Sequence, residues 1–255
     1  MSKYFYFNWK SNPESLETAN QLCKKYVEIA NSNSISFKIF PPSILISSLE
    51  KSGLPINFIG LQNISDSNSG AFTGEISALL AKSLNLKTAL IGHSETRERQ
   101  KLTNQNILSK VERCLENEII PVLCVGYDPK NLGDGADFEK VLLDEITYYF
   151  DNLSSTFLNT VNQIETEIVI AYEPVWAIGS GKSASLEHIN HILSKIKSIS
   201  QKYPGFLNVK FLYGGSVNSS SVSQYLESSD IDGFLIGGSS LKISELESFE
   251  NTLTK

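Results

Sequence analysis

Short apolar runs alternate with longer amphipathic segments along the chain. The runs are rich in β-branched and aromatic residues, which is typical of strands that are buried on both faces. They predict eight strands, at Tyr4–Asn8, Phe37–Phe40, Asn57–Leu61, Thr88–Ile91, Ile119–Val125, Thr166–Ala171, Val209–Leu212 and Gly233–Ile236.

The segments between these runs predict helices. After the sixth run, for example, Leu186, Ile189 and Leu193 fall on one face of a helix. Strands that alternate with helices pair in parallel through right-handed crossovers. The predicted fold class is therefore α/β, a closed (β/α)8 barrel that occupies residues 1–255 as a single domain. An open doubly wound sheet is the alternative, but no GxGxxG turn follows the first strand.

Composition and charge narrow the classes of function. A net charge of −6 argues against general nucleic-acid binding, and no apolar run is long enough to span a bilayer. The 3 cysteines and the lack of a signal-peptide pattern favour a reducing, cytoplasmic location over a disulfide framework. An anionic ligand would need a local positive site to offset the overall negative charge.

Polar side chains gather where the predicted strands end. In a parallel barrel the carboxyl ends of the strands meet at one rim, and active sites form there. Asn8 and Lys10 follow the first strand, His93 the fourth and Glu173 the sixth. Each has an ordinary alternative: a turn residue, a solvated lysine, a structural imidazole or a surface carboxylate.

These side chains suit proton transfer. Glu173 precedes Pro174, an apolar tip and a glycine-rich turn, so it is a candidate general base beneath a closing lid. A helix is predicted to begin just after His93, with Ser94 as a candidate for its capping residue, and a helix N-terminus lowers the pKa of an imidazole. A neutral imidazole can donate a hydrogen bond to a carbonyl, and Lys10 can stabilise a developing oxyanion.

Two glycine pairs predict an anion site. Gly214-Gly215-Ser216 and Gly237-Gly238-Ser239 follow the seventh and eighth strands. Backbone N–H groups that no Cβ crowds bind phosphate at the start of short helices, and barrels often use this position. The alternative is a pair of tight strand-to-helix turns.

Together these motifs resemble those of the triosephosphate isomerase family, across the whole chain and in the family's order. The matching segments are Asn8-x-Lys10, GAFTGEIS at 70–77, Gly92-His93-Ser94-Glu95, IVIAYEPVWAIGSGKSAS at 168–185, Tyr213-Gly214-Gly215-Ser216 and Gly237-Gly238. The resemblance implies interconversion of dihydroxyacetone phosphate and D-glyceraldehyde 3-phosphate, within glycolysis and gluconeogenesis. It implies no cofactor or metal, and the sequence shows no cluster of metal ligands.

The resemblance also implies roles for individual residues. Glu173 would be the catalytic base, His93 the electrophile and Lys10 the cationic stabiliser, with Asn8 beside it at the substrate. The residues implied to bind the substrate phosphate through backbone N–H groups are Gly179, Ser216, Gly237 and Gly238.

Supporting contacts are implied between Glu95 and Lys10, and between Tyr213 and the lid through Ala184. The loop that contains Thr73 would interlock two subunits of a homodimer and bring Thr73 near the partner's active site. Its polar stretch QNISDSNSG at 62–70 has the length of a functional loop.

Three details depart from the family or lie outside its motifs. Thr96-Arg97 stands where the family usually has two arginines, which bears on packing between subunits. Tyr127 stands where a glutamate usually helps to hold the lid tryptophan, Trp176 here, with Tyr172. His188, on the helix after the lid, is predicted to be a surface residue.

Two other functions fit the same residues. One is a paralogue that isomerises a four-carbon sugar phosphate with the same acid–base groups and a different pocket size. The other is a barrel that has lost catalysis and serves as a binding protein. The presence of Asn8, Lys10, His93 and Glu173 together argues against the second.

Overall fold

The computed structural model describes residues 3–32, 35–127, 137–157, 167–175, 183–203, 206 and 208–253. The strands are β1 Tyr4–Asn8, β2 Ser36–Phe40, β3 Thr88–Ile91, β4 Ile120–Val125, β5 Ile168–Tyr172, β6 Val209–Tyr213 and β7 Gly233–Ile236. The α-helices are α1 Leu16–Ser32, α2 Ile46–Lys51, α3 Ala78–Ser83, α4 Ser94–Gln100, α5 Asn104–Glu116, α6 Phe138–Phe157, α7 Leu186–Ser200, α8 Ser223–Leu226 and α9 Ile243–Leu253. The 3₁₀ helices are η1 Ser43–Leu45, η2 Ile56–Phe58 and η5 Gly238–Leu241.

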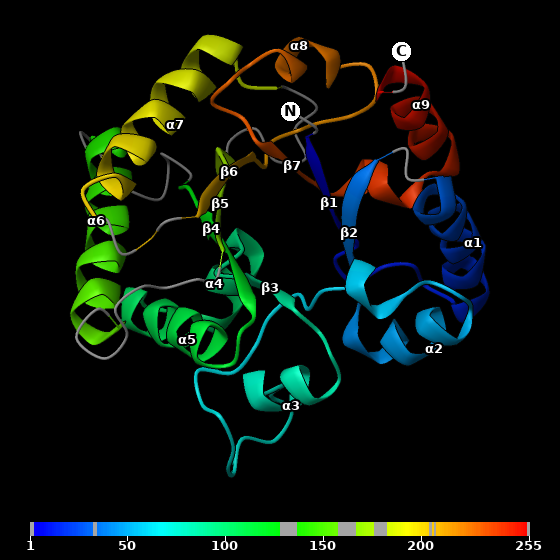
Figure 1. Cartoon of the computed structure of the whole chain (residues 1–255), viewed down its shortest axis with the longest axis horizontal. Coiled ribbons are helices and arrows are strands. Elements are labelled where there is room, and N and C mark those ends of the chain that lie inside the picture. The colour runs from blue at the N-terminus through cyan, green and yellow to red at the C-terminus, as the bar shows by residue number, and fades with distance from the viewer. Residues whose placement is uncertain are drawn as a thin grey trace.

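The strands form a parallel sheet in the order β2-β1-β7-β6-β5-β4-β3. In Figure 1 the helices form an outer ring around these strands. The segment between β2 and β3 closes the ring, because Ile59 forms a parallel bridge with Ile39 and Leu61 forms one with Ala89. The chain therefore folds as the predicted (β/α)8 barrel.

The third predicted strand, Asn57–Leu61, is wrong in detail. Its first residues belong to the 3₁₀ helix η2, which follows Pro55, and only the isolated bridges remain of the strand. Gly60 passes so close to its neighbours that a Cβ there would lie 2.5 Å from the Phe40 ring. The barrel closes through backbone contact at this point, and the apolar pattern could not distinguish single bridges from a regular ladder.

The core has two layers, one inside the barrel and one between the strands and the helices. In β5, Val169 and Ala171 belong to the inner cluster, whereas Ile168 and Ile170 belong to the cluster beneath the helices. Successive side chains of a strand point to opposite faces, so a strand buried on both faces must be apolar throughout. Burying each valine or isoleucine of this strand contributes about 1.5–3 kcal/mol.

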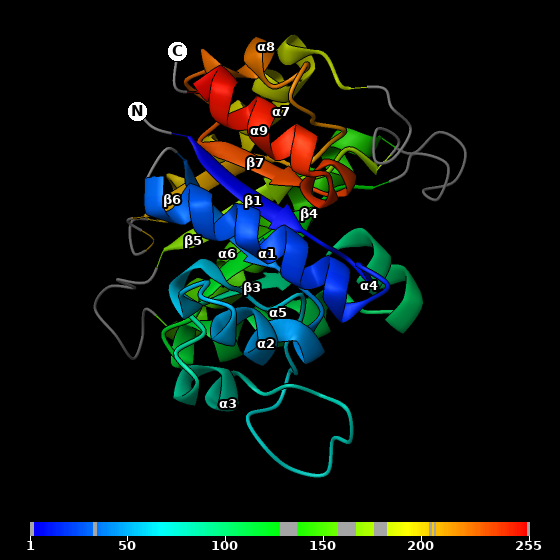
Figure 2. The same ribbon diagram turned by 90° about the vertical axis from the view of Figure 1, so that its right-hand side faces the viewer.

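The chain between Leu61 and α3 forms a long loop that projects from the barrel (Figure 2). Phe72 in this loop is exposed, and its accessible surface is 48% of its maximum. Within the described part of the chain, no helix combines the length and the apolar character required to cross a membrane.

Candidate active site

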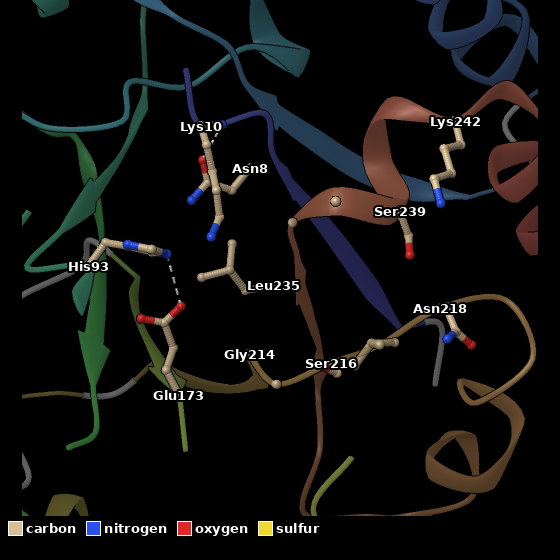
Figure 3. A pocket seen from close by; sticks show the side chains of 14 residues that line it. Asn8, Lys10, His93, Glu173, Gly214, Ser216, Asn218, Leu235, Ser239 and Lys242 are labelled. Atoms are coloured by element: carbon tan, nitrogen blue, oxygen red, sulfur yellow. Dashed lines mark hydrogen bonds and ion pairs between the residues drawn. The ribbon is translucent and has the colours of Figure 1, made fainter. Parts of the chain in front are cut away.

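Side chains from several strand ends meet in one cavity of about 360 Å³ at the carboxyl rim of the barrel. Asn8 and Lys10 enter it from β1, His93 from the end of β3 and Glu173 from the end of β5. Figure 3 shows His93 and Glu173 pointing toward one another, with His93 Nε2 3.2 Å from Glu173 Oε1. The sequence-predicted residues of the rim are thus brought together.

Glu173 is a buried carboxyl group, 3% exposed, directly after β5. Burial raises the pKa of Glu173, and the neighbouring His93 and Lys10 only partly oppose that shift. A carboxylate with a raised pKa is a stronger base than an ordinary one, which suits the removal of a weakly acidic proton. The backbone N–H of Glu173 donates to the Val125 carbonyl over 2.7 Å, so the residue is held against the end of β4.

Two glycines leave room for Glu173. Gly126 has φ +147°, and a Cβ on it would lie 1.8 Å from the Glu173 carbonyl oxygen. A Cβ on Gly214 would lie 2.7 Å from Glu173 Cγ. Both distances are far below van der Waals contact, so side chains at either position would displace the carboxylate.

His93 caps helix α4 itself, so the prediction that Ser94 caps this helix is wrong. Its Nδ1 accepts a hydrogen bond from the Glu95 backbone N–H over 3.3 Å. A neutral imidazole that accepts at Nδ1 carries its proton on Nε2, and Nε2 faces Glu173 and the cavity. The helix start therefore fixes both the orientation and the tautomer of this histidine.

Lys10 is held by contacts on three sides. Its Nζ lies 2.6 Å from Glu95 Oε1, and its backbone N–H donates to Asn8 Oδ1 over 2.9 Å. Gln62 Nε2 donates to the Lys10 carbonyl over 2.7 Å. Lys10 adopts φ +56°, which an L-residue occupies only at a cost of about 1–2 kcal/mol. Backbone strain at a rim residue is commonly retained for function.

The pKa of Glu95 reflects this pairing. Partial burial alone would raise the pKa, but the hydrogen bond and the charge of Lys10 outweigh it and hold the pKa below its ordinary value. Glu95 therefore stays ionised beside Lys10 and keeps the ammonium group at the cavity.

Both glycine turns line the cavity: Gly214 lies beside Glu173, whereas Ser216 and Ser239 lie on the side away from Glu173 (Figure 3). Gly237 approaches Lys10 closely, since a Cβ on it would lie 3.3 Å from Lys10 Cε. Gly238 also lines the cavity, and the side chain of Ser183 donates to the Ser216 carbonyl over 2.8 Å.

Ala184 is clamped by two tyrosines. Its backbone N–H donates to Tyr213 Oη over 3.0 Å, and its carbonyl accepts from Tyr225 Oη over 2.9 Å. The Tyr213 ring in turn needs Gly215, where a Cβ would lie 2.1 Å from the hydroxyl. The predicted contact of Tyr213 with Ala184 is therefore present.

Comparison with known proteins agrees with this geometry. The family model described as triosephosphate isomerase matches residues 3–253. The chain belongs to the triosephosphate isomerase family. A protein named triosephosphate isomerase from Francisella philomiragia is 36% identical over 100% of this chain and 98% of its own length. One of the same name from Mesomycoplasma hyorhinis is 34% identical over 97% of this chain and 96% of its own.

Within this family frame, the predicted Glu95–Lys10 ion pair is present. Gly179 and Trp176, predicted as a phosphate contact and a lid residue, lie outside the described residues. Thr73 is exposed in the long loop.

His188 was expected at the surface, but it is half-buried and its Nε2 lies 3.0 Å from Tyr172 Oη. The resemblance to the family implies that Tyr172 helps to hold the lid tryptophan, so His188 contacts a residue with an expected role at the lid. The helical pattern placed His188 beside the apolar face and could not reveal a partner on another element.

Sequence reasoning missed three residues that hold the site. Gln62 bonds the Lys10 and Phe40 carbonyls, and Tyr225 bonds Ala184. Arg97 Nε donates to the Gly92 carbonyl over 2.6 Å, directly before His93. Gln62 directly follows a predicted strand, so the strand-end rule would have found it, whereas Tyr225 and Arg97 carry no local signal.

Proposed function

We propose that this protein interconverts dihydroxyacetone phosphate and D-glyceraldehyde 3-phosphate. The two relatives described above are named triosephosphate isomerase, and this chain matches each of them over nearly its whole length. The observation that carries the proposal is the buried pair of Glu173 and His93 in a cavity whose far side is lined by Ser216 and Ser239 of the glycine turns. That arrangement fits a small substrate with a carbonyl at one end and a phosphate at the other.

Glu173 acts as the base. It removes a proton from the carbon next to the carbonyl, and the released electron pair forms the C=C bond of an enediolate. His93 donates a hydrogen bond from Nε2–H to the carbonyl oxygen that gains charge. It then gives its Nε2 proton to that oxygen and takes the hydroxyl proton from the neighbouring oxygen of the enediolate. Return of the proton from Glu173 to the neighbouring carbon completes the isomerisation. In the substrate complex, Glu173 and His93 exchange their mutual contact for substrate atoms.

Lys10 offsets the negative charge of the enediolate, and Asn8 orients Lys10 and the substrate oxygen. The phosphate accepts hydrogen bonds from the backbone N–H groups of Ser216, Gly237 and Gly238, together with that of Gly179. Trp176 belongs to the lid that excludes water over the intermediate, and Tyr213 secures the end of that lid through Ala184.

The decisive test measures the conversion of D-glyceraldehyde 3-phosphate to dihydroxyacetone phosphate, and the reverse reaction, with the purified protein. Glu173→Asp withdraws the carboxylate by one methylene and should lower turnover about 10²-fold or more. Normal turnover in this variant would remove Glu173 from the role of base. Rates on three-carbon and four-carbon sugar phosphates measured side by side distinguish this function from the paralogue, and no rate on either, in a folded protein, would support a binding role.

A homodimer is also part of the proposal. A second groove of about 540 Å³ adjoins Lys10 and is lined by Gln62, Glu95 and Thr96. The loop carrying Thr73 projects with Phe72 exposed, and buried Lys110 Nζ donates to the Ile64 carbonyl at its base. A loop that is anchored by this hydrogen bond and exposes an apolar side chain suits insertion into such a groove on a second copy.

Sedimentation velocity tests the dimer. Thr73→Arg should shift the protein toward the monomer and lower turnover, because a bulky charge would have to enter a groove. A wild-type monomer with full activity would contradict the dimer but leave the isomerase function standing.

We further propose that residues 1–255 form one domain in the cytoplasm, where reducing conditions match three buried free cysteines.

A further inference from the structure

Lys242 is a cation at the phosphate end of the cavity that neither the strand ends nor the family motifs single out. It follows the 3₁₀ helix η5 and directly precedes α9, and it lines the same cavity as Glu173 and His93. Figure 3 shows its side chain extending toward Ser239, on the side of the glycine turns away from Glu173. Lys10 and Lys242 thus lie toward opposite ends of one cavity.

The backbone that carries Lys242 is fixed. Its N–H lies 3.4 Å from the Ser239 carbonyl, and the Ser240 N–H donates to the Gly237 carbonyl over 2.9 Å. The buried Tyr26 hydroxyl of α1 donates to the Ser240 carbonyl over 2.8 Å. The turn therefore holds the Lys242 Cα in a constant place beside the glycine N–H groups, while the four-carbon stem remains free to reach a ligand.

The charges at the two ends differ in one important respect. Lys10 is paired with Glu95 at 2.6 Å, so part of its charge is already neutralised. In the described ranges, Lys242 forms no ion pair with any carboxylate within 4.0 Å. The nearby Glu245 carboxylate instead accepts from the Ser219 backbone N–H over 2.9 Å. Lys242 therefore presents an unneutralised positive charge on a protein whose net charge is −6.

We propose that Lys242 is a second, mobile cationic contact for the substrate phosphate. Its ammonium group attracts the phosphate from solvent and then contacts those phosphate oxygens to which no backbone N–H group donates. This inference rests on the proposed function, because it takes the substrate to be a phosphate monoester. A compact ammonium at the mouth of a cavity raises the local concentration of an anion, and the gain falls as salt screens the field. The effect belongs to binding, since Lys242 lies away from Glu173 and His93.

Lys242→Met and Lys242→Arg test this role, with Lys24→Met as the matched control. Lys24 is an exposed lysine on α1, it does not line the cavity, and its replacement changes the net charge equally. At an ionic strength near 0.01 M, Lys242→Met should raise KM for glyceraldehyde 3-phosphate on the order of tenfold with little change in kcat. Lys242→Arg should restore most of the affinity. The defect should shrink at 0.15 M salt, where the Debye length falls from about 30 Å to about 8 Å.

A substrate without the phosphate separates a phosphate contact from a general structural role. With D-glyceraldehyde, the ratio of wild-type to Lys242→Met kcat/KM should be close to one. An equal loss on both substrates, or a KM defect that salt does not change, would overturn the proposal. So would a KM for Lys242→Met that matches that of Lys24→Met.

Binding of inorganic phosphate, followed by ³¹P NMR titration, tests Lys242 without any turnover. The dissociation constant should rise on the order of tenfold in Lys242→Met and stay unchanged in Lys24→Met. If the wild type shows no isomerase activity, the proposed function fails, and this titration alone still decides whether Lys242 binds the anion. Identical phosphate binding in all variants would refute the inference even in an active enzyme.

Discussion

Gly214→Ala is the sharpest test of how the barrel places its base. Gly214 has no unusual φ, so alanine adds no backbone strain there. The new Cβ would, however, lie 2.7 Å from Glu173 Cγ, whereas carbon atoms in contact lie about 3.5–4.0 Å apart. The Glu173 side chain or the Gly214 backbone must therefore shift by roughly 1 Å. A displacement of this size at a reacting group costs about 10²-fold in rate, or about 2.7 kcal/mol of activation free energy.

Steady-state kinetics with glyceraldehyde 3-phosphate measure this loss as a fall in kcat. Competitive inhibition by inorganic phosphate should change little, because the glycine N–H groups at 237 and 238 are not moved. The midpoint of thermal unfolding serves as the control for folding. A kcat within about threefold of the wild type, in a folded variant, would refute the inference that Gly214 sets the position of the carboxylate.

Three further predictions follow from charges in and near the site. The folded protein binds the Glu173 proton more tightly than the unfolded chain does, so ionisation of Glu173 lowers the stability of the protein as pH rises through the raised pKa. Glu173→Gln should therefore raise the midpoint of thermal unfolding at pH 7, and this gain should vanish below about pH 4, where the group is protonated in both states. An equal gain at all pH values would contradict this reasoning. Glu145 is buried, and its Oε1 lies 2.8 Å from Arg97 Nη1. Arg97→Met would remove the cationic partner of this carboxylate and should lower the free energy of unfolding in urea by about 3–5 kcal/mol. Arg99→Met, at the surface, should lower it by well under about 1 kcal/mol. Because the charge of Lys10 lowers the pKa of Glu173, Lys10→Met should move the acid limb of the pH profile of kcat/KM upward, and an unmoved limb would show that the two groups are not coupled.

Much of the fold was predictable because its determinants are local. A strand buried on both faces must be apolar throughout, so the strand-sized runs were visible, including the one that ends before Glu173. The strand-end rule then placed Asn8, Lys10 and His93 on one rim without any measured distance. The apolar-run pattern failed at residues 57–61, where two isolated bridges on either side of Gly60 replace regular pairing.

The supporting contacts were not predictable, because each joins residues far apart in the chain. Tyr225 reaches back to Ala184, and Arg97 reaches forward to the Cys124 carbonyl over 2.9 Å. A tyrosine or an arginine on a helix has no local feature that names its partner. His93 illustrates the same limit nearby, since only the observed geometry distinguishes a capping imidazole from a capping Ser94.

The amino-acid sequence by itself determined the order of strands and helices, the identity of the reactive groups and the rim at which they gather, because periodicity and strand direction are properties of short segments. The tertiary structure decided the pKa direction of Glu173, the tautomer of His93 and, among the residues that the structure describes, the lack of an ion pair at Lys242. These depend on burial and on distances of a few ångströms between distant segments. Electrostatic energy varies steeply over such distances, so only the folded chain can set it.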